Sequence, residues 1–214
     1  MKRIVLTDGG MGQELLRRSG AAPTPLWSAR VLIDEPDLVR DLHADFIDAG
    51  ARVITINTYA ATPERLEREG VGELFEELQQ RGIDLAKQAR DMTGADVRIA
   101  GCLPPLFGSY KPELTLSFDE TLEIYRRVVA AQKDQVDLIL CETMASAEEA
   151  LAAATAASEA SLPVWVSWTL QDSLDGAQLR SGETIEEAAK AIAHIKFEAR
   201  MINCSKPEVI SAGM

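Results

Sequence analysis

The chain has 214 residues, of which 46% are hydrophobic and 26% charged, an ordinary composition for a globular protein. Its formal net charge of −12 argues against nucleic acid or anionic lipid as a partner, because both require a basic face. The longest apolar stretch, "ALAAATAAS", is well short of the roughly 20 residues of a transmembrane helix, so no membrane partner is expected.

Short apolar runs rich in Val, Ile, Leu and Thr recur along the chain and predict strands. They occupy residues 3–8, 52–59, 97–102, 137–143, 164–170 and 200–205. Several of them are continuously apolar, which is typical of parallel strands covered by helices on both faces.

Longer stretches with a helical period separate these runs. Residues 35–50 carry one apolar face and end at Gly50, and a stretch that begins at Ser117 has Glu120 at the third following position, as in a capping box. Helices are also predicted over 63–93 (in two pieces divided near Gly70–Gly72), 146–160 and 181–195.

Six βα units in succession predict an α/β fold with a parallel sheet and right-handed crossovers. Such a sheet is either open and doubly wound or closed into a barrel. A (β/α)8 barrel of the TIM type typically needs about 250 residues. A chain of 214 residues with about six units would therefore be an incomplete barrel that lacks the last two units.

The three cysteines do not indicate a disulfide framework, because their number is odd. The apolar run "IVL" before Asp8 is too short for a signal peptide. We therefore expect a cytoplasmic protein in a reducing compartment.

Polar side chains lie where the predicted strands end, which is where parallel α/β folds place their chemistry. Among them are two acids, Asp8 after the first strand and Glu142 after the fourth. Each acid alone can be a helix cap. Two carboxylates at one mouth repel each other unless a cation lies between them, so together they favour a site for a cationic group.

The segment "TDGGMGQELLRR" places glycines between Asp8 and a helix start. Successive backbone N–H groups in such a turn can bind an anion, although the GK[ST] ending of a P-loop is absent. A ligand whose carboxylate binds to these N–H groups and whose ammonium binds to Asp8 would be an amino acid. The alternative is a structural glycine turn with Asp8 as its cap.

Cys204 follows Asn203 in "INCS", near the end of the last predicted strand. A lone cysteine is commonly inert packing, and spacing alone does not decide between packing and metal ligation. Cys141 is adjacent to Glu142 on a strand, so the two side chains point to opposite faces and Cys141 is interpreted as structural. The spacing of Cys102 from the other cysteines does not assign a role to Cys102.

In these motifs the chain resembles the homocysteine S-methyltransferase family. The matching stretches are "LTDGGMGQELLRR", "AGARVITINTYAATPERL", "GCLPPLFGSY", "LILCETMASAEEAL", "VSWTLQDSLDGAQLRSGETIEEA" and "INCSKPEVI". The resemblance implies one homocysteine-binding barrel domain over 1–214, truncated before its last two units. It also implies methyl transfer from a sulfonium or ammonium donor to a zinc-activated homocysteine thiolate, which gives methionine.

The resemblance also implies residue roles. Asp8 and Gly9 would hold the amino-acid part of homocysteine, Glu142 its ammonium, and Asn203 the loop around the metal ligand Cys204. The other two zinc cysteines of the family belong to a Gly-Gly-Cys-Cys segment that is not found here, so the chain is expected to bind zinc weakly and to be inactive or impaired. An aromatic face, for which Tyr59 is the candidate, could hold the cationic donor.

Two other interpretations remain open from the residues. The chain can be a non-catalytic relative that binds an amino acid, or an unrelated α/β enzyme in which Asp8 and Glu142 are an acid/base pair. Because an incomplete barrel has two unpaired sheet edges, we also expect a homo-oligomer.

Overall fold

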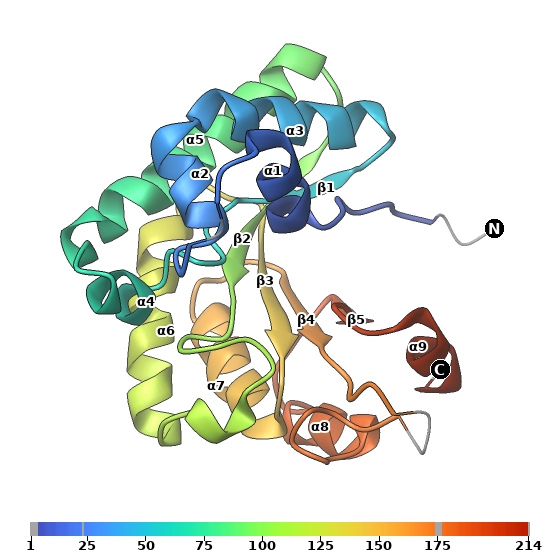
Figure 1. Ribbon diagram of the computed structural model, residues 1–214. Coiled ribbons are helices and arrows are strands. Elements are labelled where there is room, and N and C mark those ends of the chain that lie inside the picture. The colour runs from blue at the N-terminus through green and yellow to red at the C-terminus, as the bar shows by residue number, and fades with distance from the viewer. Residues whose placement is uncertain (1–3, 23, 174–176, 214) are drawn as a thin grey trace. The chain divides into compact units, whose positions relative to one another are not determined.

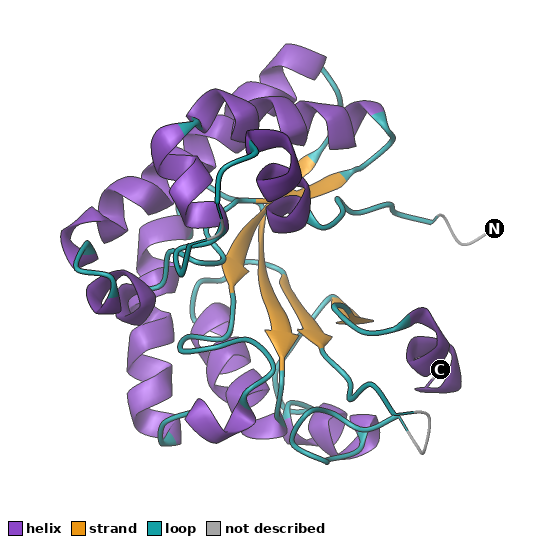
Figure 2. Ribbon diagram, viewed as in Figure 1, coloured by secondary structure: helices purple, strands orange, loops and turns teal. Residues whose placement is uncertain are grey.

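The computed structural model describes residues 4–22, 24–173 and 177–213, in which helices and strands alternate (Figures 1 and 2). The chain forms two compact units. Unit 1 comprises the residues up to Cys102 together with Ala131–Leu138, and unit 2 comprises Leu103–Ala130 and the residues from Ile139 onward. Each unit has parallel strands and helices of its own. The expectation of a single barrel domain over 1–214 stays a prediction.

The strands of unit 1 are β1 (Val53–Thr55) and β2 (Arg98–Leu103), which pair in parallel. Where a strand was expected over 3–8, the described residues show one isolated parallel bridge, between Thr7 and Val53. The preceding apolar side chains are exposed, with 91% of Ile4 accessible to solvent. The apolar run therefore lacks the burial that normally fixes a strand; residue 3 lies outside the described part of the chain.

Unit 1 holds α1 (Met11–Ser19), α2 (Ser28–Asp34), α3 (Pro36–Asp48), α4 (Pro63–Arg68), the short η1 (Gly72–Leu74) and α5 (Phe75–Thr93). The helices α1, α2, α3 and α5 contact one another and form one group (Figure 1). The predicted division of 63–93 is confirmed, because Gly70 has a positive φ of 72° between α4 and η1. The seven-residue α2 was not predicted.

The strands of unit 2 are β3 (Leu138–Met144), β4 (Val164–Trp168) and β5 (Ala199–Ile202), with β4 paired in parallel to both others. The run predicted over 200–205 stops as a strand at Ile202. Its next residues are bent out of the extended conformation, since Cys204 has a φ of +48°. This turn places Asn203 and Cys204 in the loop at the carboxyl end of β5.

Unit 2 holds η2 (Pro112–Leu114), α6 (Phe118–Gln132), α7 (Ala147–Ser158), α8 (Ile185–Ala191) and α9 (Pro207–Gly213). One half of the capping box predicted at Ser117 is present, because the Ser117 backbone N–H and hydroxyl both donate to the Glu120 carboxylate. At α7 the Ser146 hydroxyl accepts a hydrogen bond from the Glu149 backbone N–H, and Thr184 forms a full capping box at α8. Helix α7 packs on β4 and α8. In the part of the chain that is described, no helix is long and apolar enough to cross a membrane.

Candidate active site

In unit 1, Asp8 lies beside the carboxyl end of β1, as the sequence predicts for a residue at a strand end. Its carboxylate accepts hydrogen bonds from the Thr55 backbone N–H at 2.6 Å and from the Thr55 hydroxyl at 3.4 Å. Its own N–H donates to the Val53 carbonyl at 3.0 Å. Asp8 therefore joins the N-terminal segment to β1 and remains half-buried.

The glycines after Asp8 allow side chains to pack closely on the backbone. A Cβ on Gly12 would come within 2.5 Å of the Trp27 ring, and one on Gly9 within 2.9 Å of the Phe46 ring. A Cβ on Gly10, in contrast, would meet nothing within 4 Å. Packing thus accounts for Gly9 and Gly12, and the role of Gly9 in substrate binding stays a prediction.

Tyr59 is half-buried in unit 1 and lies against two other side chains. The Trp27 ring meets it edge-on with centroids 5.7 Å apart, and the Arg65 guanidinium lies 5.4 Å from the Tyr59 ring centroid. A resident cation on the ring competes with a bound cationic donor for the same interaction. The contact with Arg65 therefore argues against one face of Tyr59 as the donor site.

In unit 2, β3 carries Glu142 half-buried and Cys141 fully buried. Burial in an apolar environment raises the pKa of the Cys141 thiol. This is the environment expected for a structural cysteine on the opposite face of the strand from Glu142. Cys102, in unit 1, is also buried, with 1% of its surface accessible.

Asn203 is the centre of a hydrogen-bond network at the ends of β3, β4 and β5. Its side-chain oxygen accepts from the Thr143 N–H at 3.1 Å and from the Ser167 hydroxyl at 2.8 Å. Its side-chain nitrogen donates to the Thr143 hydroxyl at 2.9 Å and to the Cys204 sulfur at 3.5 Å. The network uses each polar atom of the Asn203 amide, and it fixes which of them faces the sulfur.

The sulfur of Cys204 has further polar neighbours. The Thr143 hydroxyl lies 3.7 Å from it, and the Tyr110 side chain is close enough for Cys204 to raise the pKa of Tyr110. Burial first, and then the charge and hydrogen bond of the Cys204 side chain, raise the pKa of Tyr110 to about 12, so its hydroxyl remains a donor at neutral pH. The Asn203 amide and the Thr143 hydroxyl thus both direct hydrogen-bond donors at the Cys204 sulfur.

Backbone strain gathers at the same sulfur. Positive φ angles occur at Tyr110 (65°), Thr143 (62°) and Cys204 (48°), all of them residues other than glycine. Conformations of this kind are unfavourable for residues with a side chain, and they persist where the surroundings impose them, often at functional sites. The chain therefore holds Cys204 and two of its neighbours in a geometry that strand pairing alone does not require.

Sequence reasoning missed Tyr110 and Thr143 as neighbours of Cys204. Thr143 was visible as the second residue of "ET", and Tyr110 as the last residue of "GCLPPLFGSY". Neither motif specifies on its own that its hydroxyl meets a cysteine more than 60 positions further along the chain. Of the predicted site residues, the structure brings Asn203 and Cys204 together in unit 2.

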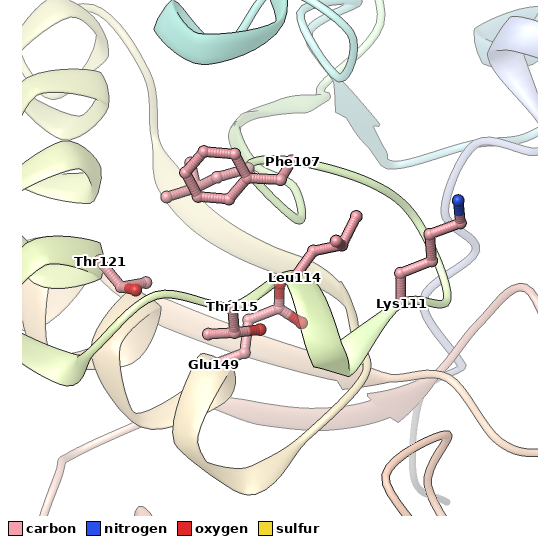
Figure 3. Close-up of a pocket in the computed structure, with 7 residues that line it drawn as sticks. Phe107, Lys111, Leu114, Thr115, Thr121 and Glu149 are labelled. Atoms are coloured by element: carbon pink, nitrogen blue, oxygen red, sulfur yellow. The ribbon is translucent and has the colours of Figure 1, made fainter.

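A shallow surface hollow lies elsewhere in unit 2 (Figure 3). Two of its polar groups are used within the fold, since the carboxylate of the buried Glu149 accepts from the Ala145 N–H and the Thr121 hydroxyl donates to the Leu116 carbonyl. Figure 3 shows the Lys111 ammonium directed away from the other labelled side chains. The hollow therefore does not bring several polar side chains together around one reactive atom, as the Cys204 loop does.

The described residues do not make a zinc site. Nowhere among them do three His, Cys, Asp or Glu side chains come together so that they could hold a metal ion. Cys204 is exposed, whereas Cys102 and Cys141 are buried. Catalytic zinc sites typically use three protein ligands and one open position, so a single thiolate does not meet the requirement.

Comparisons with known proteins add an independent line of evidence. The sequence profile of the homocysteine S-methyltransferase family matches residues 5–214. The chain is 32% identical to a selenocysteine methyltransferase from Astragalus bisulcatus, over 97% of this chain and 70% of that protein. It is 30% identical to the homocysteine S-methyltransferase of Escherichia coli strain K12, over 99% of this chain and 72% of that protein.

A solved structure is similar over the same range. The metallated form of the homocysteine methyltransferase MmuM from Escherichia coli aligns with 99% of this chain and 78% of its own, with a TM-score of 0.87 and 29% identity. This similarity confirms the predicted α/β fold of the TIM-barrel type, of which the chain spans a part. Since the family profile and these relatives cover nearly all of the chain, it belongs to the homocysteine S-methyltransferase family, whose named members are methyltransferases.

Proposed function

We propose that the chain acts in the transfer of a methyl group from a sulfonium or ammonium donor to the sulfur of homocysteine, which gives methionine. The observation that carries this proposal is the polar network around Cys204, in which a strained loop directs hydrogen-bond donors at one sulfur. Family membership supports the reaction class and removes the alternative of an unrelated α/β enzyme.

The reaction balances without a redox step. The homocysteine sulfur attacks the methyl carbon of the donor and forms a new carbon–sulfur bond. The bond between that methyl group and the donor sulfur or nitrogen breaks, its electron pair stays with the leaving sulfide or amine, and the thiol proton is released to solvent. Holding the two partners in line supplies much of the rate in a reaction of this kind.

The proposed roles of the substrate-binding residues follow the sequence prediction. Asp8 and Gly9 hold the amino-acid part of homocysteine, and Glu142 contributes to binding its ammonium group. Asn203 orients the Cys204 loop, a role that its four hydrogen bonds support. Tyr59 is the weakest of these assignments, because Arg65 already lies over its ring.

Zinc is the metal that the family resemblance implies, and one relative was solved in a metallated form. Cys204 is the residue here that would ligate it. Since one exposed thiolate does not form a catalytic zinc site, we propose that the chain as given binds zinc weakly. Equilibrium dialysis that shows tight binding of one zinc per chain would contradict this.

The same observation favours a second candidate function, binding of an amino acid without catalysis. In that case the pocket for homocysteine is retained and the methyl-transfer step is lost. Binding of homocysteine or methionine with no methyl transfer at any zinc concentration would identify this function.

An assay with isotope-labelled methyl donors tests the main proposal. The chain is incubated with S-methylmethionine or betaine, and with homocysteine or selenocysteine as the acceptor, with and without added zinc. The proposal predicts labelled methionine from homocysteine, or labelled Se-methylselenocysteine from selenocysteine, and a loss of product in Cys204→Ser. Product formation that is unchanged in Cys204→Ser and after chelation would overturn the assigned role of Cys204.

A further inference from the structure

Arg180 is a cation whose hydrogen-bonding capacity is only partly used. Its Nη1 and Nη2 atoms lie 3.3 and 3.4 Å from the two carboxylate oxygens of Asp172, longer than the usual 2.7–2.9 Å of a charge-assisted hydrogen bond. Its Nε atom is buried and has no hydrogen-bond partner among the described residues. Because a guanidinium carries five N–H donors, Arg180 has donors that Asp172 does not satisfy.

Arg180 lies one side chain away from the Cys204 sulfur. Its guanidinium carbon is 4.9 Å from the centroid of the Tyr110 ring, and Tyr110 is the residue whose pKa the neighbouring Cys204 side chain raises. The Arg180 side chain is 18% exposed and that of Asp172 is 50% exposed, so the ion pair is open to solvent on the Asp172 side. The three residues Asp172, Arg180 and Tyr110 thus form a chain of contacts that ends at Cys204.

The chemistry of a guanidinium selects the kind of ligand. Its planar fork matches a carboxylate, and it repels the cationic end of a methyl donor. The methyl donors S-methylmethionine and betaine each have both parts, an onium centre that carries the methyl group and a carboxylate at its other end. A carboxylate held by Arg180 would leave the onium end of the donor near the sulfur that Tyr110 contacts.

We propose that Arg180 binds the carboxylate of the methyl donor, and that Asp172 holds the guanidinium in place until the donor displaces it. The inference rests on the proposed methyl-transfer function and adds to it a residue that selects donors with a carboxylate. The donor carboxylate replaces the two long contacts with Asp172 by shorter ones, while Tyr110 keeps the guanidinium beside the Cys204 loop.

Isothermal titration calorimetry on the full chain tests the assignment with two pairs of probes. S-methylmethionine is compared with its decarboxylated analogue, (3-aminopropyl)dimethylsulfonium, and betaine with tetramethylammonium. In Arg180→Gln, affinity for each carboxylate probe is expected to fall about tenfold, the effect of one lost charge-assisted contact at a partly exposed site, with little change for the decarboxylated probes. In Arg180→Lys, which keeps the charge and loses the fork, the loss should be smaller.

Asp172→Asn gives the sharper test, because it removes the competing carboxylate. Affinity for S-methylmethionine and betaine is expected to rise severalfold, whereas a merely structural ion pair would leave it unchanged or lower it. Equal losses for carboxylate and decarboxylated probes in Arg180→Gln, weaker binding in Asp172→Asn, or no binding of any donor to the wild-type chain would each overturn the proposal.

A parallel titration with homocysteine distinguishes failure of the Arg180 assignment from failure of the proposed methyl-transfer function. If homocysteine binds and is unaffected by Arg180→Gln, the donor assignment is judged by the donor probes alone. A loss of homocysteine affinity in Arg180→Gln would place the amino-acid carboxylate at Arg180 and overturn the donor assignment. Failure of homocysteine to bind to the wild-type chain would count against the proposed function itself.

Discussion

Two segments were expected to bind substrate, and their polar residues, glycines and cysteine make different kinds of contact in the structure. In the segment Asp8–Gly12 of unit 1, the acid bonds to Thr55 of β1, and two glycines make room for the rings of Trp27 and Phe46. In the loop Asn203–Ser205 of unit 2, the side chains bond to one another and to Thr143 and Ser167 around an exposed sulfur. The first segment is explained largely by packing, and the second is not.

The difference shows which signals point to chemistry. Glycines beside an acid look like an anion site in sequence, but close packing demands small residues just as strongly. Positive φ angles at residues with side chains, gathered at one sulfur, have no such packing explanation. The comparison therefore assigns the function first to the Cys204 loop and only second to the glycine segment.

The largest effect that bears on the comparison is expected for Gly12→Ala. A Cβ at this position would meet the Trp27 ring at 2.5 Å, so the free energy of unfolding should fall by about 1–3 kcal/mol despite the better helix propensity of alanine. Urea unfolding followed by circular dichroism measures the change. The matched control is Gly10→Ala, where nothing lies within 4 Å and little loss is expected. Equal effects of the two substitutions would mean that packing does not explain Gly12.

The second prediction concerns His43 on α3, a buried polar residue of unit 1 whose effect we expect on stability alone. Burial lowers its pKa to about 3, and neither of its ring nitrogens has a partner in the described part of the chain. The unfolded state takes up a proton below pH 6.5 and the folded state does not, so stability should fall as the pH drops from 6.5 toward 3.

Between pH 7 and pH 5, His43 should account for a loss of about 2 kcal/mol in the free energy of unfolding. The measurement is the difference between wild type and His43→Leu in urea unfolding at the two pH values. If the two proteins lose the same stability between pH 7 and pH 5, the buried neutral histidine is refuted.

On the other side of the comparison, Asn203→Asp should change reactivity more than stability. It keeps the oxygen that accepts from Thr143 and Ser167 and replaces the donor to Cys204 by a negatively charged group. Alkylation of Cys204 by iodoacetamide at pH 7 should slow by about tenfold, because the sulfur loses a hydrogen-bond donor and the new carboxylate repels the thiolate form that reacts. Slow labelling of the buried Cys102 and Cys141 is the internal check that the fold is intact. An unchanged alkylation rate at Cys204 would contradict the proposal that Asn203 orients the Cys204 loop.

The smallest effect is expected for Tyr110→Phe, which removes the hydroxyl beside the Cys204 side chain and keeps the ring under Arg180. Alkylation of Cys204 should slow by about threefold, the usual size of a single partly exposed hydrogen bond. Mass spectrometry of the labelled peptide measures the rate. A larger effect than that of Asn203→Asp would reverse the ranking of the two donors.

The sequence predicted most of the fold, because local signals control it. Apolar runs located β2, β3 and β4 to within about two residues, and the serine at position 146 marked the start of α7. Three strands were predicted too long. The run 52–59 forms a strand only over Val53–Thr55. The run 3–8 is reduced to the Thr7 bridge, and the run 200–205 is cut at Ile202 by the bend at Cys204.

The site was only partly predictable, for a physical reason. Motifs singled out Asp8, Glu142, Asn203 and Cys204 as candidates, since these residues were expected at strand ends, and their roles in binding stay predictions. The partners of Cys204 depend on how the loop that contains Tyr110 folds back, and no periodicity encodes such a contact. The pair of Arg180 with Asp172 was likewise invisible, because two charges eight residues apart in a loop have many possible partners.

The central claim is that the Cys204 sulfur faces the substrate site, and competition between labelling and ligand tests it most directly. The native chain is alkylated with iodoacetamide, with and without saturating methionine, which is the proposed product and has no thiol to consume the reagent. The account predicts that Cys204 is labelled well before Cys102 and Cys141, and that methionine slows its labelling. A Cys204 rate that methionine does not change up to its solubility limit, or labelling of Cys204 no faster than that of the buried cysteines, would contradict the account.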